Sequence, residues 1–175
     1  MLLVKRKVDN KLLAIKVISK LKIIEEETLS HIRNEKFVLE HVDSKFILKM
    51  DGFFQTETNL FFITECLETD LYYLLKNSKN KRFSEEEVAF FTIGIAVALQ
   101  NLHDLNFTYR DLKPENVLIN SKGFPVLCDF GLINLLVPTH KAYTMCGTPE
   151  YFAPELIVSN FYDERVDWWA LGILM

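Results

Sequence analysis

The chain has 175 residues, of which 49% are hydrophobic, and it contains 14 phenylalanines. This composition predicts a folded protein with a sizeable core rather than a disordered segment. The formal net charge of −4 argues against a nucleic-acid-binding protein, because such proteins present a basic surface. Three cysteines without C-x-x-C spacing argue against a disulfide framework or a zinc site and fit a reducing compartment.

The N-terminal sequence does not resemble a signal peptide, because only the short apolar run Met1–Val4 precedes the charged run Lys5–Lys7. No apolar run approaches the roughly 20 residues that a membrane-spanning helix needs. We therefore expect a cytoplasmic protein without a membrane span.

The first part of the chain predicts a small sheet with one helix. Lys11–Ile18 is typical of a buried strand, and Ile47–Phe54 and Leu60–Cys66 predict two further strands. Between them, Glu27–Val42 has helical spacing of apolar residues, but Glu35 falls on the apolar face. A carboxylate at such a position is the first indication of function.

After Cys66 the sequence becomes mostly helical. Ser84 and Glu87 predict a capping box at the start of a helix that runs to about His103. The remaining predicted elements are a short hairpin, Val117–Asn120 with Pro125–Cys128, and an apolar helix that begins within Arg165–Met175.

Three motifs in the second part carry chemical information. The run YRDLKPEN spans residues 109–116, in a segment that Pro114 keeps from continuing as a helix. Asp129-Phe-Gly follows the predicted hairpin, and Ala153-Pro-Glu comes later. In this order the motifs match the catalytic loop, the metal-binding motif and the end of the activation segment of protein kinases. The chain therefore resembles a protein kinase catalytic domain.

Phosphoryl transfer depends mainly on positioning and on electrostatic stabilisation of phosphate oxygens. Asn116 and Asp129 provide the oxygen ligands that Mg²⁺ prefers. Asp111 would orient or accept the proton of the attacking hydroxyl, and Lys113 would steady the transferred phosphate. Each residue alone would be read as an ordinary loop residue, whereas the set predicts a catalytic site that uses ATP and Mg²⁺.

Lys16 lies inside an apolar strand, and Glu35 lies on an apolar helix face. Each charge is costly to bury alone, and pairing removes most of that cost. The pair resembles the lysine–glutamate ion pair of protein kinases. In that pair the lysine contacts the α- and β-phosphates of ATP, and the glutamate fixes the lysine. A structural ion pair without a ligand is the alternative.

Further residues narrow the resemblance to the AGC group of serine/threonine protein kinases, nearest to the cyclic-nucleotide-dependent kinases. They are Tyr109, the run TMCGTPEYFAPE from Thr144, and DWWALG from Asp167. The resemblance implies an α+β, bilobal protein-kinase-like fold. Residues 1–66 would form an incomplete antiparallel β lobe with one key helix, and residues 67–175 an incomplete, mostly helical lobe.

The same resemblance implies a nucleotide site and a substrate site. It places Ala14 and Leu118 against the two faces of the adenine ring. Glu65 and Leu67 would form backbone hydrogen bonds with adenine, and Thr64 would guard the pocket behind the ring. Asp70 borders this site, and Asp70 and Glu115 are candidate acidic contacts for basic residues of a protein substrate.

The resemblance also implies regulation through Thr144, the expected phosphorylation site of an upstream kinase. Arg110 and His31 would hold the phosphate, although a surface histidine is the alternative for His31. Asn134 replaces a basic residue that is usual in relatives, which weakens the expected phosphate pocket. Thr148 would hydrogen-bond the catalytic Asp111 and Lys113, which predicts Ser or Thr as the acceptor.

None of the six glycines belongs to a G-x-G-x-x-G loop, and residue 1 aligns just after that loop in relatives. The sequence also ends inside the helix that contains Asp167. We therefore expect a fragment of an active serine/threonine kinase. The alternative is a kinase-like module that captures nucleotide or a partner without efficient turnover.

Overall fold

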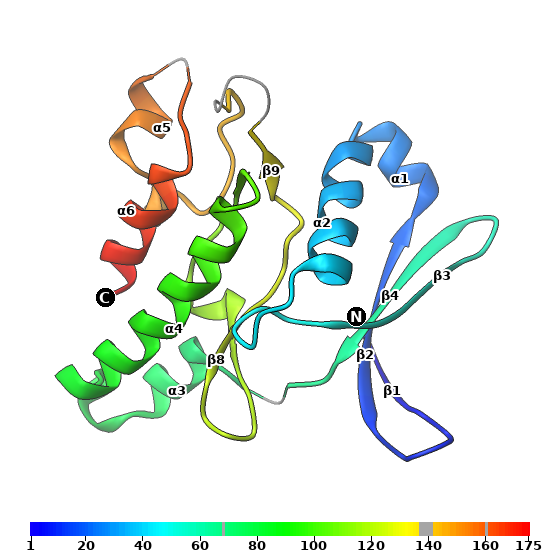
Figure 1. Cartoon of the computed structure of the whole chain (residues 1–175), viewed down its shortest axis with the longest axis horizontal. Helices are drawn as coiled ribbons and strands as arrows, with labels where there is room; N and C mark the ends of the chain where they lie inside the picture. The colour runs from blue at the N-terminus through cyan, green and yellow to red at the C-terminus, as the bar shows by residue number, and fades with distance from the viewer. Residues whose placement is uncertain (68, 137–141, 160) are drawn as a thin grey trace.

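The computed structural model describes residues 1–67, 69–136, 142–159 and 161–175. Strands β1–β4 and helices α1 and α2 lie on one side of the molecule in Figure 1, and helices α3–α6 lie on the other. The strands are β1 (Leu2–Lys5), β2 (Leu12–Ser19), β3 (Met50–Gln55), β4 (Asn59–Glu65), β5 (Thr69–Asp70), β6 (Phe107–Thr108), β7 (Val117–Ile119), β8 (Pro125–Leu127) and β9 (Asn134–Leu135). The α-helices are α1 (Lys20–Glu25), α2 (Leu29–His41), α3 (Leu71–Asn77), α4 (Glu85–His103), α5 (Pro154–Val158) and α6 (Arg165–Leu174). Short 3₁₀ turns occupy Lys79–Lys81, Pro114–Asn116 and Pro149–Tyr151. This is the α+β fold with an antiparallel sheet that the sequence predicts.

The main sheet has the strand order β1-β2-β4-β3, and all its neighbouring strands are antiparallel. Leu13 in β2 and Phe62 in β4 are buried, so one face of the sheet contributes to the core. Ala14 lies directly opposite Thr64 in the β2–β4 register. Directly paired residues project from the same face of a sheet, so the two side chains lie together.

Two elements of the first part were not predicted from the sequence, namely β1 and α1. The turn between β1 and β2 contains Asn10 at φ 60°, a left-handed conformation that asparagine tolerates. Arg6 forms an ion pair with Asp9 across this turn and a second with Asp51 in β3. A short apolar run that starts at Leu2 and is followed by a turn is compatible with a hairpin. It can be recognised as a strand only once its pairing with β2 is known.

Helix α2 confirms the unusual position of Glu35. Its buried residues are Glu35, Val38 and Leu39, so the carboxylate lies on the same face as the apolar side chains. Glu35 is only 2% exposed. The helix therefore directs a buried carboxylate toward the sheet.

Helix α4 is the long central helix of the second part. It buries an apolar face formed by Ile95, Ala98, Leu99 and Leu102. A side chain at Gly94 would overlap the ring of Pro125, so this glycine permits the close approach of α4 and β8. None of the described helices is long and apolar enough to cross a membrane.

A continuous apolar core joins the two parts of the molecule. The cluster includes Val38 and Phe62 from the first part and Leu99, Leu127 and Phe130 from the second. The backbone of β8 also exchanges hydrogen bonds with the segment before β3, because the Leu48 amide donates to the Leu127 carbonyl at 2.9 Å. Contacts of this kind fix the sheet relative to the helical part and position the residues between them.

The capping box at the start of α4 generates a stability prediction. The Ser84 hydroxyl accepts from the Glu87 amide, and the Glu87 carboxylate accepts from the Ser84 amide. We expect Ser84→Ala to lower the free energy of unfolding by about 1 kcal/mol, because one helix-terminal amide loses its partner. Urea denaturation measures this value. Ser121→Ala, at an exposed turn, is the control and should change it by less than about 0.5 kcal/mol; equal effects of the two variants would contradict the role of the cap.

Candidate active site

The loop that contains Asp111 is held from the buried side by Asp167 of α6. The carboxylate accepts hydrogen bonds from the backbone amides of Tyr109 and Arg110, both at 2.8 Å. It also contacts His103 Nε2 at 2.8 Å. Arg110 has φ 74°, which is uncommon for a residue with a side chain. The Asp167 carboxylate therefore fixes a strained backbone beside Asp111.

Three predicted residues converge on the Asp111 carboxylate. Thr148 Oγ1 donates to Asp111 Oδ1 at 2.7 Å, and Lys113 Nζ donates to Oδ2 at 2.8 Å. Asn116 Nδ2 also contacts Oδ2, at 2.9 Å. Lys113 Nζ reaches Thr148 Oγ1 at 3.1 Å, which closes the network. The carboxylate is thus surrounded by donors, an arrangement that stabilises negative charge and fixes its orientation.

Asp129 lies across the site from this network, directly after β8. Its φ is 51°, and its side chain is 55% exposed. The next residue, Phe130, is buried against Tyr109, with the two rings 5.8 Å apart in an edge-to-face arrangement. Burial of Phe130 therefore fixes the backbone while the Asp129 carboxylate faces the open part of the site.

Lys16 joins the sheet to both carboxylates. Its Nζ lies 2.6 Å from Glu35 Oε1 and 3.2 Å from Asp129 Oδ1. Burial opposes the charge on Lys16, but Glu35 and then Asp129 more than offset this effect, so the pKa of Lys16 is raised. Burial also raises the pKa of Glu35, and the attraction of Lys16 offsets part of that change. The predicted pair exists, and Lys16 is positively charged at neutral pH.

These residues surround a cavity of about 360 Å³. Its lining includes all but one of the residues predicted for the nucleotide and the metal, namely Ala14, Lys16, Glu35, Thr64, Glu65, Leu67, Asn116, Leu118 and Asp129. Glu115, which was predicted to contact the substrate, also lines the cavity. The volume is in the range of small-molecule binding sites. Asp70 is placed differently, because its carboxylate accepts from the Tyr73 amide and caps α3. Its backbone pairs with Leu118, so Asp70 lies at the margin of the cavity.

The cavity offers few protein ligands for a metal ion. No group of three or more His, Cys, Asp or Glu residues that could hold a metal occurs in the part of the chain that the structure describes. Two hard oxygen donors remain in the cavity, the carboxylate of Asp129 and the side-chain amide oxygen of Asn116. Such a pair fits Mg²⁺, which usually takes one or two protein ligands and completes its shell with phosphate and water.

Of the regulatory residues predicted from the sequence, His31 and the backbone carbonyl of Thr144 are related to Arg110, whereas Thr148 contacts Asp111. Arg110 Nε donates to the Leu132 carbonyl at 2.7 Å, and Nη1 donates to the Tyr162 hydroxyl at 3.0 Å. The Tyr162 hydroxyl donates in turn to the Thr144 carbonyl at 2.5 Å. Burial lowers the pKa of His31, and the nearby positive charge of Arg110 lowers it further. Residues 137–141, which precede this segment, lie outside the described residues.

Three residues of the site were missed in the sequence. His103 contacts Asp167, Tyr162 connects Arg110 to Thr144, and Gly147 has φ 109° beside the Arg110 carbonyl. A side chain at Gly147 would overlap that carbonyl, so glycine is required there. The position of Gly147 directly before Thr148 could have indicated its role from the sequence. The roles of His103 and Tyr162 arise only from long-range packing.

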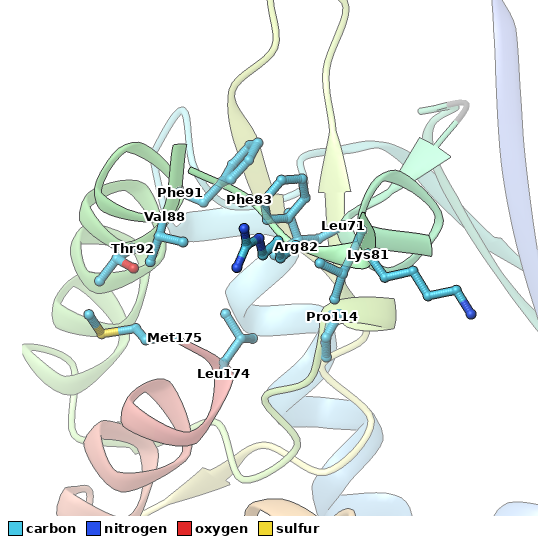
Figure 2. Close-up of a pocket in the computed structure, with 11 residues that line it drawn as sticks. Leu71, Lys81, Arg82, Phe83, Val88, Phe91, Thr92, Pro114, Leu174 and Met175 are labelled. Atoms are coloured by element: carbon cyan, nitrogen blue, oxygen red, sulfur yellow. The ribbon is translucent and has the colours of Figure 1, made fainter. Parts of the chain in front are cut away.

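A second cavity, of about 270 Å³, lies between α3, α4 and the end of α6. Figure 2 shows its apolar lining, which includes Phe83, Phe91 and Leu174, with Pro114 at one side. None of the predicted site residues lines it. It is therefore separate from the chemistry around Asp111.

The anchoring of the loop by Asp167 can be tested by substitution. We expect Asp167→Ala to lower the free energy of unfolding by about 3–5 kcal/mol, because two buried backbone amides lose their acceptor. Thermal or urea denaturation measures the change. Asp163→Ala removes an ion pair with the exposed Arg165 and should cost less than about 1 kcal/mol. A loss at Asp167 no larger than at Asp163 would show that the loop does not depend on this carboxylate.

Comparison with known proteins agrees with this geometry. The sequence model of the protein kinase domain family matches residues 1–175 of the chain. The RAC family serine/threonine-protein kinase homolog of Dictyostelium discoideum is 40% identical over 98% of this chain and 39% of that protein. Serine/threonine-protein kinase YPK1 of Saccharomyces cerevisiae is 41% identical over 98% of this chain and 25% of that protein. Serine/threonine-protein kinase Sgk2 of Rattus norvegicus is 41% identical over 99% of this chain and 48% of that protein.

The chain thus spans less than half the length of each of these relatives. The narrower resemblance to cyclic-nucleotide-dependent kinases stays a prediction. The family itself is established by the match over the whole chain and by the assembled motifs. The chain belongs to the protein kinase domain family and, within it, to the AGC group that its motifs predict.

Proposed function

We propose that the protein is a serine/threonine kinase that transfers the γ-phosphoryl group of ATP to hydroxyl groups of protein substrates. The observation that carries this proposal is the network in which Thr148, Lys113 and Asn116 all contact the Asp111 carboxylate. A carboxylate held in this way beside a cavity is suited to orient a hydroxyl and to accept its proton.

The residues around the cavity fit ATP with Mg²⁺. Bound Mg²⁺ would neutralise developing charge on the phosphates, and Asp129 and Asn116 would hold it. Lys16, kept charged by Glu35, would bind phosphate oxygens at the other side of the cavity. Ala14 and Leu118 would contact the adenine ring, which needs apolar surfaces on both faces.

The substrate side of the proposal rests on Thr148 and the acidic residues. Thr148 bridges Asp111 and Lys113, which supports Ser or Thr as the acceptor. Glu115 is exposed next to the catalytic loop, and its charge favours basic residues in a substrate; Asp70 is a second candidate for this contact. We also propose a cytoplasmic location, which the cysteine content supports.

We further propose that an upstream kinase phosphorylates Thr144. Arg110 Nη2 is buried and has no hydrogen-bond partner among the described residues. A phosphate near Arg110 and His31 would supply an acceptor and a negative charge. It would counteract burial and the positive charge of Arg110, which now lower the pKa of His31. Asn134 adds no positive charge there, so the phosphate would be held by fewer cations than in relatives with a basic residue.

The alternative function, a module that binds without turnover, is not favoured by this site. Binding of nucleotide requires the cavity, Lys16 and Asp129. It does not require Lys113 and Thr148 to be directed at Asp111, since these contacts concern the acceptor hydroxyl. Their presence supports catalysis.

The activity is tested by transfer of labelled phosphate from Mg²⁺–ATP to a basic serine peptide. We expect Asp129→Ala to lower the rate by at least about 100-fold, because an essential charge in the site is lost. Asp43→Ala is the control, since Asp43 forms only an exposed ion pair with Lys49 and should leave the rate unchanged. Equal incorporation by the wild-type chain and Asp129→Ala would refute the kinase proposal.

Thr64 generates a prediction about inhibitors. It is 7% exposed and lines the cavity opposite Ala14. We expect Thr64→Met to weaken the binding of bulky ATP-site inhibitors by at least about tenfold, because the longer side chain fills space that they need. Calorimetric dissociation constants measure this effect, with Thr58→Met in an exposed turn as control. Equal inhibitor affinity of the wild-type chain and the Thr64→Met variant would contradict this prediction.

A further inference from the structure

The cavity between α3, α4 and the end of α6 has no part in the proposed phosphoryl transfer. Its volume of about 270 Å³ lies just below the usual range of small-molecule sites, which suits a slender ligand. Leu71, which is 4% exposed, and the buried Pro114 line its inner side. Arg82 and Met175, which also line it, are exposed. The cavity therefore opens to solvent on one side and ends against the core on the other.

The walls of this cavity are apolar and are held by the core. Leu71 belongs to the main core cluster, and Phe83, Phe91 and Leu174 pack against that cluster. The rings of Phe83 and Phe91 lie 5.3 Å apart. Val88 continues the apolar wall along α4. Walls of this kind favour a hydrocarbon chain, because each methylene group that leaves water for an apolar surface lowers the free energy.

The charges at the cavity are all positive. Its described lining contains Lys81 and Arg82 and no acidic residue. The Arg82 carbonyl accepts from the Ser78 hydroxyl at 3.1 Å, but the guanidinium has no ion pair or hydrogen bond with the residues that the structure describes. Figure 2 shows this guanidinium turned toward the space between α4 and Leu174, whereas Lys81 extends away. An unpaired cation thus lies beside an apolar cavity.

We infer that this cavity binds a medium-chain fatty acid, with its hydrocarbon chain against the apolar walls and its carboxylate paired with Arg82. The planar fork of a guanidinium matches a single carboxylate with two parallel hydrogen bonds. A phosphate group carries a larger charge and calls for more than one cation, whereas only Arg82 faces the cavity in Figure 2. The inference does not rest on the proposed kinase function, because none of the predicted site residues lines this cavity.

The test measures the binding of decanoic acid to the 175-residue chain by isothermal titration calorimetry at neutral pH. We expect saturable binding of one molecule per chain. Octanoic acid should bind about tenfold more weakly, because two fewer methylene groups are buried and each contributes roughly a factor of three to four. Decanol has the same chain without the carboxylate and should bind at least about fivefold more weakly than decanoic acid.

Substitutions separate the two parts of the proposed site. Arg82→Gln should weaken the binding of decanoic acid about tenfold and leave that of decanol unchanged, because only the charged contact is lost. Lys79→Gln is the matched control, since Lys79 is exposed in the same short turn region and does not line the cavity. Thr92→Trp adds a large side chain to the lining and should abolish the binding of both ligands. Thermal denaturation verifies that each variant is folded.

Several outcomes would overturn the inference. Absence of saturable binding would exclude the site, and equal affinities for decanoic acid and decanol would exclude the carboxylate contact. An unchanged affinity for decanoic acid in Arg82→Gln would exclude the role of this guanidinium. Binding that persists in folded Thr92→Trp would place the ligand elsewhere. Self-association of the chain that decanoic acid does not reverse would assign the apolar walls to a second copy instead.

Discussion

The ammonium group of Lys16 is the interaction on which the arrangement of the site depends. It connects β2 to α2 through Glu35 and to the segment after β8 through Asp129. Lys16 and Glu35 would each be costly to hold near the core alone, and their pairing reduces that cost. Because the three groups come from distant parts of the sequence, their contact aligns the sheet, the helix and the segment that carries Asp129 at once.

Asp167 has a comparable role beneath the catalytic loop, although it acts through backbone amides. Arg110 and Asp129 both have positive φ values, which are unfavourable for residues with side chains. The two amides bound by Asp167 hold the first of these positions, and the burial of Phe130 beside Tyr109 holds the second. Strain at the two ends of the site is therefore balanced by buried contacts outside the cavity, so the reactive carboxylates stay accessible.

The sequence was informative where the signal is local. The capping box at Ser84 and the helical spacing around Glu35 depend on neighbours within one or two turns, and both are confirmed. Strand β1 was missed because its stability comes from pairing with β2, and Tyr162 was missed because its partners lie 18 and 52 residues away. Motifs predicted which residues form the site, but the contacts that hold Arg110 required the folded chain.

The backbone and the side chain of Arg110 are held by different contacts. Its backbone is fixed by Asp167, whereas its guanidinium is held by the Leu132 carbonyl and the Tyr162 hydroxyl and keeps one unpaired nitrogen among the described residues. An anion that binds this nitrogen would therefore leave the catalytic loop in place. It would act instead on Tyr162 and, through the Thr144 carbonyl, on the segment that carries Thr148. Regulation at this position would change the contact of Thr148 with Asp111 while the position of Asp111 itself stays constant.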